Sequence, residues 1–462
     1  MSFTMMKKIL LVSTSSRYVL DKTLTSYSFA LGFLSAVLSR NNYSVEILDL
    51  FCEEWKNGKA LLLDSLKKFK PDAVGFNIIT MNRFSTYEAI NLIKKLAPKT
   101  KIILGGCHAT IMYKQLLKNF PIDAIVLGEG EETIIDLLKN FDNLKKVKGI
   151  AFMHKNQLIK TAPRDFIKDL DSLPIVEHNR FINKDSKVAF VFTSRGCPYN
   201  CSFCSASLHW KRICRFRSTS SVIKEIEHLL LNYPNLEEIR FMDDNFTMNN
   251  DRVIEICKEM IKRKLKIKWR CSGRVYPLSK EMIKWLDKAG CIMIGFGVES
   301  GSQKLLNEIG KNQTREQIID AYKTIYENSK ITPDTFLIVG LPGENESTIN
   351  ETIDLIKKIN KIGKKPLLLT AARMLEIYPG TKIYEIAKAK GMVNDDYWLK
   401  HSETPVYLEH DKKWLKKMRR RIILANWTSC GLLPIIKLFF QKRMWNPRKI
   451  YNILRPYIRG IN

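Results

Sequence analysis

Short apolar segments of strand length alternate with helical patterns from residue 8 to about residue 395. The first segment is Lys8-Ile-Leu-Leu-Val-Ser13, and the stretch from Ser28 to Arg40 then carries apolar residues at helical spacing. Continuously apolar strands separated by helices are typical of parallel sheets that helices cover on both faces. The alternation therefore predicts an α/β protein. Functional residues are expected at the carboxyl ends of the strands, where such sheets bind their ligands.

The alternation falls into two blocks. In the first block, strands are expected at 8–13, 43–49, 72–79, 101–105 and 124–128. In the second block, they are expected at 188–192, 237–242, 267–272, 291–297, 335–339 and 367–375. The first block predicts a Rossmann-like, doubly wound parallel sheet, and the six units of the second predict an open, partial (β/α)6 barrel. The expected domains are 1–145 (Rossmann-like), 146–186 (linker), 187–398 (partial barrel) and 399–462 (basic helical C-terminal region).

Bulk properties limit the class of protein only loosely. A chain of 462 residues is long enough for two or three domains. Its ten cysteines, without a secretory leader, predict reduced thiols and a cytoplasmic location. No run of about eighteen apolar residues is present, so a membrane-spanning helix is not expected. The net charge of +29 is a weak indication of a partner, because lysine is abundant throughout the chain. We expect no nucleic-acid partner.

The C-terminal region 399–462 differs from the rest of the chain. After Asp411 it is rich in Lys and Arg, lacks acidic residues and contains the apolar run 431–440. Two interpretations stay open. The region is either a helical cap on the barrel or a basic, aromatic segment that makes peripheral contact with an anionic membrane. The second interpretation adds membrane association to the cytoplasmic location and makes a lipid substrate more attractive.

Three cysteines, Cys197, Cys201 and Cys204, directly follow the first strand of the second block with the spacing C-x₃-C-x₂-C. A [4Fe–4S] cluster is usually held by four thiolates, so three in one loop leave one iron open to a small molecule. The alternative is a zinc site completed by His209 or Cys214. Zinc sites usually combine two C-x₂-C pairs, and the second pair is absent from this sequence. The spacing therefore favours the cluster.

This cysteine motif, with Phe203 before its last cysteine, resembles that of the radical S-adenosylmethionine (SAM) enzymes. The resemblance implies that the open iron binds SAM. An electron from an external donor such as flavodoxin or ferredoxin then passes through the cluster and cleaves SAM to a 5′-deoxyadenosyl radical. Segments after later strands resemble SAM-contacting motifs of the same family. The SAM-contacting residues expected from these segments and from the cysteine loop are Phe203, Asp243, Asp244, Arg274, Gly297, Glu299, Ser300 and Gly340.

Some of these expectations also rest on the chemistry of the residues themselves. The guanidinium of Arg274 has the fork geometry that suits a carboxylate. Asp243 and Asp244 offer carboxylate oxygens to ammonium or hydroxyl groups, although either residue could instead cap the helix that follows. Glycine at position 297 leaves space for a ligand next to Glu299.

Two glycine-rich segments of the first block, Gly105-Gly-Cys-His-Ala-Thr110 and Gly128-Glu-Gly-Glu131, follow successive strands. They resemble those of cobalamin-binding domains fused ahead of radical SAM barrels. Glycine at strand ends lets the backbone approach a flat macrocycle. The expected cobalamin contacts are Gly105, Gly106, His108, Gly128 and Glu129. The D-x-H-x-x-G segment that supplies a cobalt ligand elsewhere is absent, so His108 is expected to pack or cap. The alternative is a Rossmann-like domain that has lost its ligand.

Together these features predict a cobalamin-dependent radical SAM enzyme that methylates an unactivated carbon of an unidentified small-molecule or lipid substrate. Such carbon–hydrogen bonds resist acid–base chemistry, which is why enzymes of this kind use a cofactor radical. The sequence leaves the catalytic side chains unassigned. The alternatives are cyclisation or rearrangement without methyl transfer, and a non-catalytic cobalamin or cluster sensor. A methylthiotransferase acting on RNA is less favoured, because only Cys52 and Cys107 precede the linker.

Overall fold

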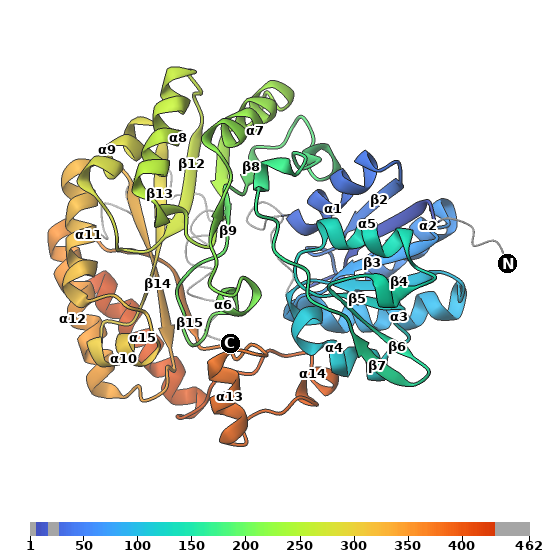
Figure 1. Cartoon of the computed structure of the whole chain (residues 1–462). Helices are drawn as coiled ribbons and strands as arrows, with labels where there is room; N and C mark the ends of the chain where they lie inside the picture. The colour runs from blue at the N-terminus through green and yellow to red at the C-terminus, as the bar shows by residue number, and fades with distance from the viewer. Residues whose placement is uncertain (1–5, 17–26, 430–462) are drawn as a thin grey trace.

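A computed structural model describes residues 6–16 and 27–429. The described chain forms two α/β units that lie side by side (Figure 1). The elements of the first unit are β1 (Lys8–Ser13), α1 (Phe29–Arg40), β2 (Ser44–Asp49), α2 (Trp55–Phe69), β3 (Ala73–Asn77), α3 (Arg83–Leu96), β4 (Lys101–Gly105), α4 (Cys107–Asn119), β5 (Ala124–Val126), α5 (Glu131–Lys139), β6 (Ile150–His154) and β7 (Gln157–Lys160).

The first unit contains a seven-stranded sheet in the order β2-β1-β3-β4-β5-β6-β7. Strands β1 to β5 are parallel, as predicted. Helices α1 and α5 pack on one face and α2, α3 and α4 on the other, with a hydrophobic core on each side. The parallel strands β1, β3, β4 and β5 are mostly apolar because both of their faces are covered.

The first part of the segment predicted to be a linker belongs to the first unit instead. Strands β6 and β7 lie within 146–186, yet they continue the first sheet, with β6 antiparallel to β5 and β7 antiparallel to β6. Ile150, Ala151 and Phe152 of β6 are buried in the cores of the first unit. The stretch 147–153 is mostly apolar in the sequence, but which strand it pairs with depends on the open edge of β5.

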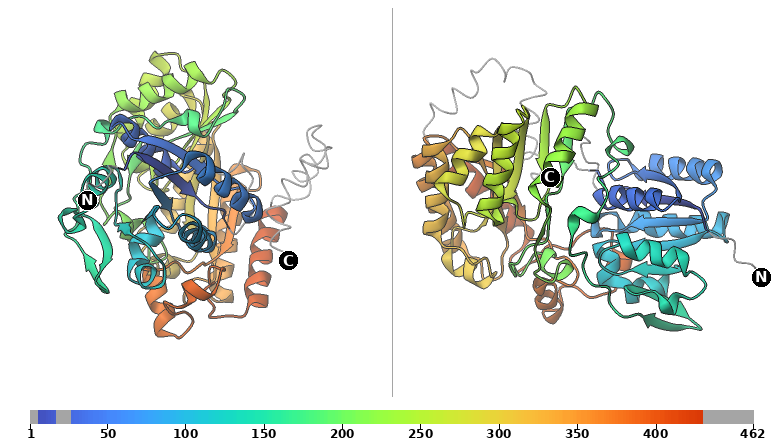
Figure 2. Two further views of the ribbon diagram at one scale, coloured as in Figure 1. Left: turned by 90° about the vertical axis from the view of Figure 1, so that its right-hand side faces the viewer. Right: turned by 45° about the horizontal axis from the view of Figure 1, so that its top comes forward.

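The second unit contains a curled six-stranded parallel sheet in the order β15-β14-β13-β12-β11-β8. All six strands expected from the sequence are present. Helices α7, α8, α9, α11 and α12 cover its outer face (Figures 1 and 2). The elements are β8 (Val188–Val191), β9 (Ser194–Arg195), α6 (Ala206–His209), β10 (Arg215–Phe216), α7 (Thr219–Asn232), β11 (Glu238–Phe241), α8 (Asn250–Lys262), β12 (Lys268–Gly273), α9 (Lys280–Lys288), β13 (Cys291–Glu299), α10 (Gln303–Glu308), α11 (Arg315–Asn328), β14 (Thr332–Val339), α12 (Glu346–Gly363) and β15 (Leu368–Met374).

The chain after β15 contains α13 (Lys382–Ala389), α14 (Tyr397–Lys400) and α15 (Lys412–Thr428). Helix α15 packs against α12, β14 and β15, and its Leu415, Met418 and Ile422 are buried in the barrel core. This agrees with the helical-cap interpretation for that part of the region. The rest, including the apolar run 431–440, lies outside the described residues. Among the helices of the described ranges, none is long and apolar enough to cross a membrane.

The segment 375–407 joins the two units. Its Leu375, Ile383 and Trp398 belong to the same hydrophobic core as the α3 and α4 face of the first sheet. The buried guanidinium of Arg83, at the start of α3, donates hydrogen bonds to the carbonyl oxygens of Trp398, His401 and Glu403. A buried cation that bonds three carbonyls from the other unit fixes the two units relative to one another.

Candidate active site

The three cysteines lie in a loop between the two short antiparallel strands β9 and β10. Cys201 is buried, while Cys197 and Cys204 are half-buried, and the amide of Cys204 donates to the carbonyl of Cys201 in a tight turn. The loop begins at Gly196, where φ is +98° and a side-chain Cβ would lie 2.0 Å from the carbonyl oxygen of Ile213. Only glycine fits this approach, so the ladder brings the loop ends together and presents the thiols from one turn.

Burial favours the protonated form of these thiols. Burial raises the pKa of the Cys204 thiol to about 11 and also raises the pKa of Cys197. Metal binding displaces thiol protons, and the clustered thiolates then gain a positive partner. In the described part of the chain, no group of three Cys, His, Asp or Glu side chains is arranged around a single metal ion. Three grouped thiols are the donor set that an iron–sulfur cluster uses, so the residues fit that group.

Asp243 and Asp244 follow β11. The buried carboxylate of Asp243 accepts hydrogen bonds from the amide of Thr193 at 2.7 Å and from the hydroxyl of Ser194 at 2.7 Å. Burial raises its pKa despite these bonds. Asp243 thus joins the end of β11 to the start of the cysteine loop. Asp244 remains exposed and accepts from the Gly196 amide at 3.2 Å.

The expected alternative for these two acids was helix capping. That alternative is wrong, because the cap of α8 is Asn249, whose side chain accepts from the amide of Arg252. Direct contact of Asp243 or Asp244 with SAM stays a prediction.

Glu299 at the end of β13 forms a buried ion pair with Lys311, with 2.7 Å between Oε1 and Nζ. The absence of a side chain at Gly297 makes room for it. A Cβ there would lie 2.4 Å from the Glu299 Oε1 and 2.6 Å from the Lys311 Nζ. The space expected at Gly297 therefore lies next to Glu299, and the strand end presents a carboxylate and an ammonium together.

Other expected SAM contacts have protein partners. The hydroxyl of Ser300 accepts from the amide of Ser302 at the start of α10. Gly340, with φ of +92°, lies against Leu415 of α15. Phe203 packs on the hydrophobic core that joins the units. Their contacts with SAM remain predictions.

Arg274, another expected contact, is placed beside the cysteine loop. Its Nη1 lies 3.7 Å from the sulfur of Cys201, and its guanidinium stacks on the ring of Tyr199. The structure therefore brings this cation to a cluster thiol, and the expected carboxylate partner remains a prediction.

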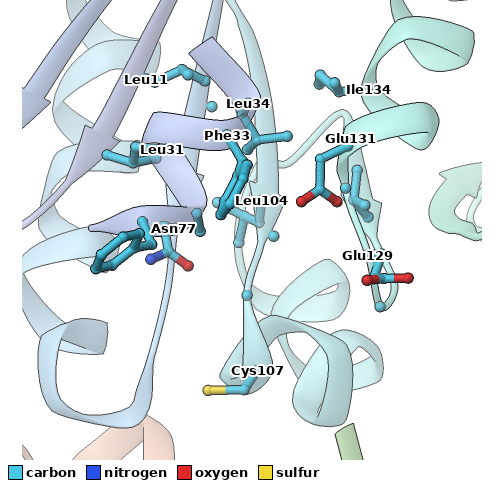
Figure 3. Close-up of a pocket in the computed structure, with 18 of the residues that line it drawn as sticks. Leu11, Leu31, Phe33, Leu34, Asn77, Leu104, Cys107, Glu129, Glu131 and Ile134 are labelled. Carbon is cyan, nitrogen blue, oxygen red and sulfur yellow. The ribbon is translucent and has the colours of Figure 1, made fainter. Parts of the chain in front are cut away.

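A cavity of ≈ 270 Å³ opens at the carboxyl ends of β3, β4 and β5. Gly105, Gly106, Gly128 and Glu129 line it, as the sequence predicts for a ligand at this edge. Figure 3 shows Phe33 of α1 facing Glu131 of α5 across the cavity. The walls are mostly apolar and aromatic, with glycine backbone at the strand ends, and this lining suits the flat, largely apolar face of a corrin.

The second unit closes the cavity. Phe192, Arg195, His209 and Trp210, all from the cysteine loop or its flanks, also line it. Arg195 Nη1 lies 2.7 Å from Glu129 Oε1, and its Nη2 lies 2.6 Å from Glu131 Oε1. The cavity therefore lies between the glycine-rich strand ends and the loop that carries the three cysteines.

Arg215 adds a second cation to this contact, since its Nη1 lies 2.8 Å from Glu129 Oε2. The carboxylate of Glu129 thereby bonds two guanidinium groups of the second unit. Its expected role as a cofactor contact stays a prediction, because both of its oxygens already have partners.

His108 does not line this cavity. The imidazole is buried near Thr80 and Tyr87, with Nδ1 3.2 Å from the Thr80 hydroxyl and Nε2 3.3 Å from the Tyr87 hydroxyl. Burial and the nearby Arg83 charge lower its pKa to about 3. The expectation that His108 packs agrees with this position, whereas its inclusion among the cofactor contacts does not. Its neighbour Cys107 lines the cavity instead, because consecutive residues of α4 face different sides.

Comparison with known proteins agrees with both sites. The profile of the radical SAM superfamily matches residues 191–356, and that of the B12 binding domain matches residues 23–138. A protein of Pyrococcus horikoshii named as an uncharacterized methyltransferase is 30% identical to this chain, over 98% of this chain and 99% of its own length. The chain belongs to the B12-binding radical SAM enzymes.

Two further relatives extend the comparison. The anaerobic magnesium-protoporphyrin IX monomethyl ester cyclase of Cereibacter sphaeroides is 35% identical over 63% of this radical SAM enzyme and 50% of its own length. The solved structure of the cobalamin-dependent SAM radical enzyme OxsB, with aqua-cobalamin and SAM bound, aligns with a TM-score of 0.72. The alignment covers 99% of this chain and 72% of OxsB at 19% identity, so it shows a shared fold.

The cofactors of this radical SAM enzyme are accordingly a [4Fe–4S] cluster, SAM and cobalamin. Sequence reasoning missed Arg195, Trp210 and Lys311 as parts of the two sites. Arg195 carried a signal, because it stands two residues before Cys197 and shortly after the apolar run 188–192. Lys311 carried none, since it comes after a complete helix that follows Glu299 and reaches that residue only through the fold.

Proposed function

We propose that this radical SAM enzyme transfers a methyl group from SAM to an unactivated carbon of a small-molecule substrate. When bound, the three cofactors supply a substrate radical and the methyl group that it accepts. The relative named as a methyltransferase, which matches almost the whole chain, supports methyl transfer. The domain boundaries predicted above are part of this proposal, with β6 and β7 assigned to the first unit.

One observation carries the proposal: the cavity of the B12 binding domain is lined by residues of the cysteine loop. Trp210 reaches the cavity from the loop that holds Cys197, Cys201 and Cys204, and Arg195 reaches it from β9, which leads into that loop. A substrate bound between the two units would lie near both cofactor sites. Methyl transfer to a carbon radical requires that proximity, since a radical that must diffuse is quenched.

The chain's own residues bind and orient in this proposal. Cys197, Cys201 and Cys204 hold the cluster, while Lys311 and Glu299 offer a cation and an anion to the polar groups of SAM. The aromatic and apolar wall of the cavity excludes water from the space between the units. An external one-electron donor protein reduces the cluster.

The test is anaerobic reconstitution of the full chain followed by incubation with SAM that carries a deuterated methyl group. The proposal predicts four irons per chain, formation of 5′-deoxyadenosine and the deuterated methyl in the product of a screen of candidate lipids and peptides. The variant with all three cluster cysteines changed to alanine should form no 5′-deoxyadenosine. The variant Cys257→Ala is the matched control, because Cys257 is buried in the barrel core away from the loop. A wild-type chain without a cluster refutes the proposal.

The cyclase relative favours a second candidate, ring closure without methyl transfer. The labelled methyl group separates the two. A product that lacks the label, formed together with 5′-deoxyadenosine, refutes methyl transfer and supports cyclisation or rearrangement.

A further inference from the structure

Arg274 is a buried cation whose neighbours are cysteine thiols. Its side chain follows β12 and is only 6% exposed. Nη1 lies 3.7 Å from the sulfur of Cys201, and Nη2 lies 3.5 Å from the carbonyl oxygen of Asn312. The guanidinium carbon lies 3.7 Å from the centre of the Tyr199 ring, so stacking holds the planar group in place.

Several other cations that are buried or nearly buried have carboxylate partners, whereas Arg83 donates to backbone carbonyls. Lys311 pairs with Glu299, and Arg195 pairs with Glu129. Within the described ranges, Arg274 forms no such ion pair, and its closest anionic candidates are the thiols of the cysteine loop. An isolated buried cation is costly, so a site that keeps one provides negative charge in the functional state. Thiolates that hold an iron–sulfur cluster supply that charge.

We propose that Arg274 is a positioning residue that raises the reduction potential of the cluster by donating to the thiolate of Cys201. The inference rests on the proposed function only in requiring a cluster on the three cysteines. Reduction adds one electron to the cluster from an external donor, without forming or breaking a bond. Because the reduced cluster carries one more negative charge, the nearby guanidinium stabilises it more than the oxidised cluster. The donor then needs less reducing power to load the electron that SAM cleavage consumes.

The test is an equilibrium redox titration of the reconstituted full chain, with dithionite as reductant and the EPR signal of the reduced cluster as readout. SAM is left out, so that any contact of Arg274 with SAM does not contribute. At a fixed potential, Arg274→Gln should lower the ratio of reduced to oxidised cluster about tenfold, which corresponds to about 59 mV for a one-electron couple. Arg274→Lys keeps the positive charge but lacks the planar guanidinium, and it should lower the ratio of reduced to oxidised cluster by about threefold.

Arg270→Gln is the matched control. Arg270 lies on β12 four residues earlier and pairs with Glu238. The cluster of Arg270→Gln should have the same reduction potential as that of the wild type. Iron content is measured for every variant. If Arg274→Gln does not retain its cluster, the comparison rests on Arg274→Lys. If a variant of Arg274 holds four irons and its cluster has the wild-type reduction potential, the role proposed for Arg274 is refuted. The proposed function is not affected by that result. A wild-type chain that holds no cluster overturns both.

Discussion

Glu129 links the B12 binding domain to the cysteine loop, and its replacement by glutamine gives the sharpest test of that link. The carboxylate is 5% exposed and accepts three hydrogen bonds, from Arg195 at 2.7 Å, from Arg215 at 2.8 Å and from the Ile167 amide at 2.9 Å. Glutamine keeps the size of the side chain and removes its charge. Arg195 then retains Glu131, while Arg215 loses its carboxylate.

The loss of stability expected for Glu129→Gln follows from the burial of its ion pairs. Breaking a buried ion pair by removing one partner costs about 3–5 kcal/mol, because the remaining charge is left uncompensated. Since Arg195 keeps one partner, we expect Glu129→Gln to destabilise the folded chain by about 3 kcal/mol, the lower end of that range. The matched control is Glu132→Gln, three residues later in the first turn of α5, whose side chain is 58% exposed and 3.8 Å from Arg164. Exposed pairs contribute about 0–1 kcal/mol.

The assay is urea unfolding of both variants and the wild type, followed by circular dichroism and by tryptophan fluorescence. Two probes are needed because a chain with two units can unfold in more than one step. Equal destabilisation by Glu129→Gln and Glu132→Gln, within about 0.5 kcal/mol, would refute the reasoning.

The effect of Glu129→Gln should also depend on pH. Burial alone would raise the pKa of Glu129, but bonds from Arg215 and Arg195 outweigh it and hold the pKa below its usual range. The stabilisation is therefore fully present above the usual Glu value of about 4.3 and is lost as the pH falls through the lower folded pKa. The difference between wild type and variant should shrink in that acidic range.

Three further predictions concern Gly196 in the cysteine loop, Arg83 at the contact between the two units, and the buried His108. Gly196→Ala should greatly lower the iron content after reconstitution, because its Cβ would meet the Ile213 carbonyl at 2.0 Å; Gly391→Ala, also at positive φ but with no atom within 4 Å, should retain the iron. Arg83→Met should destabilise the chain by about 3 kcal/mol in urea unfolding, because buried carbonyls of the other unit lose a charged donor. His108→Asn should leave the cobalamin content measured by absorbance at the wild-type value, because His108 lies outside the cavity.

Each of these has a contradicting outcome. Full iron in Gly196→Ala would show that the loop tolerates another backbone path. If Arg83→Met unfolds at the same urea concentration as the wild type, the hydrogen bonds to segment 398–403 do not hold the units together. Loss of cobalamin from a folded His108→Asn would place that histidine in the cofactor site after all.

Much of the architecture was predictable because it depends on local periodicity. The apolar runs at 8–13 and 188–192 become β1 and β8, since a short apolar segment flanked by helices is stable only inside a covered parallel sheet. The cysteine loop was equally predictable, because the spacing of Cys197, Cys201 and Cys204 within eight residues fixes them in one turn.

The pairing of β6 with β5 was not predictable in the same way. The sequence showed the apolar run of 147–153, but an antiparallel partner is chosen by whichever sheet edge lies open beside it. The expected linker therefore contained the last two strands of the first sheet.

What the sequence by itself determined is the set of elements and the identity of the groups at their ends: thiols after β8, glycines after β4 and β5, and a carboxylate at the end of β13. Only the tertiary structure decided the partners. Arg274 meets Cys201 across 73 residues of chain, and Arg195 meets Glu129 across 66. Local spacing fixes the strand end from which a side chain emerges, whereas the packing of distant strand ends fixes which charge lies opposite it.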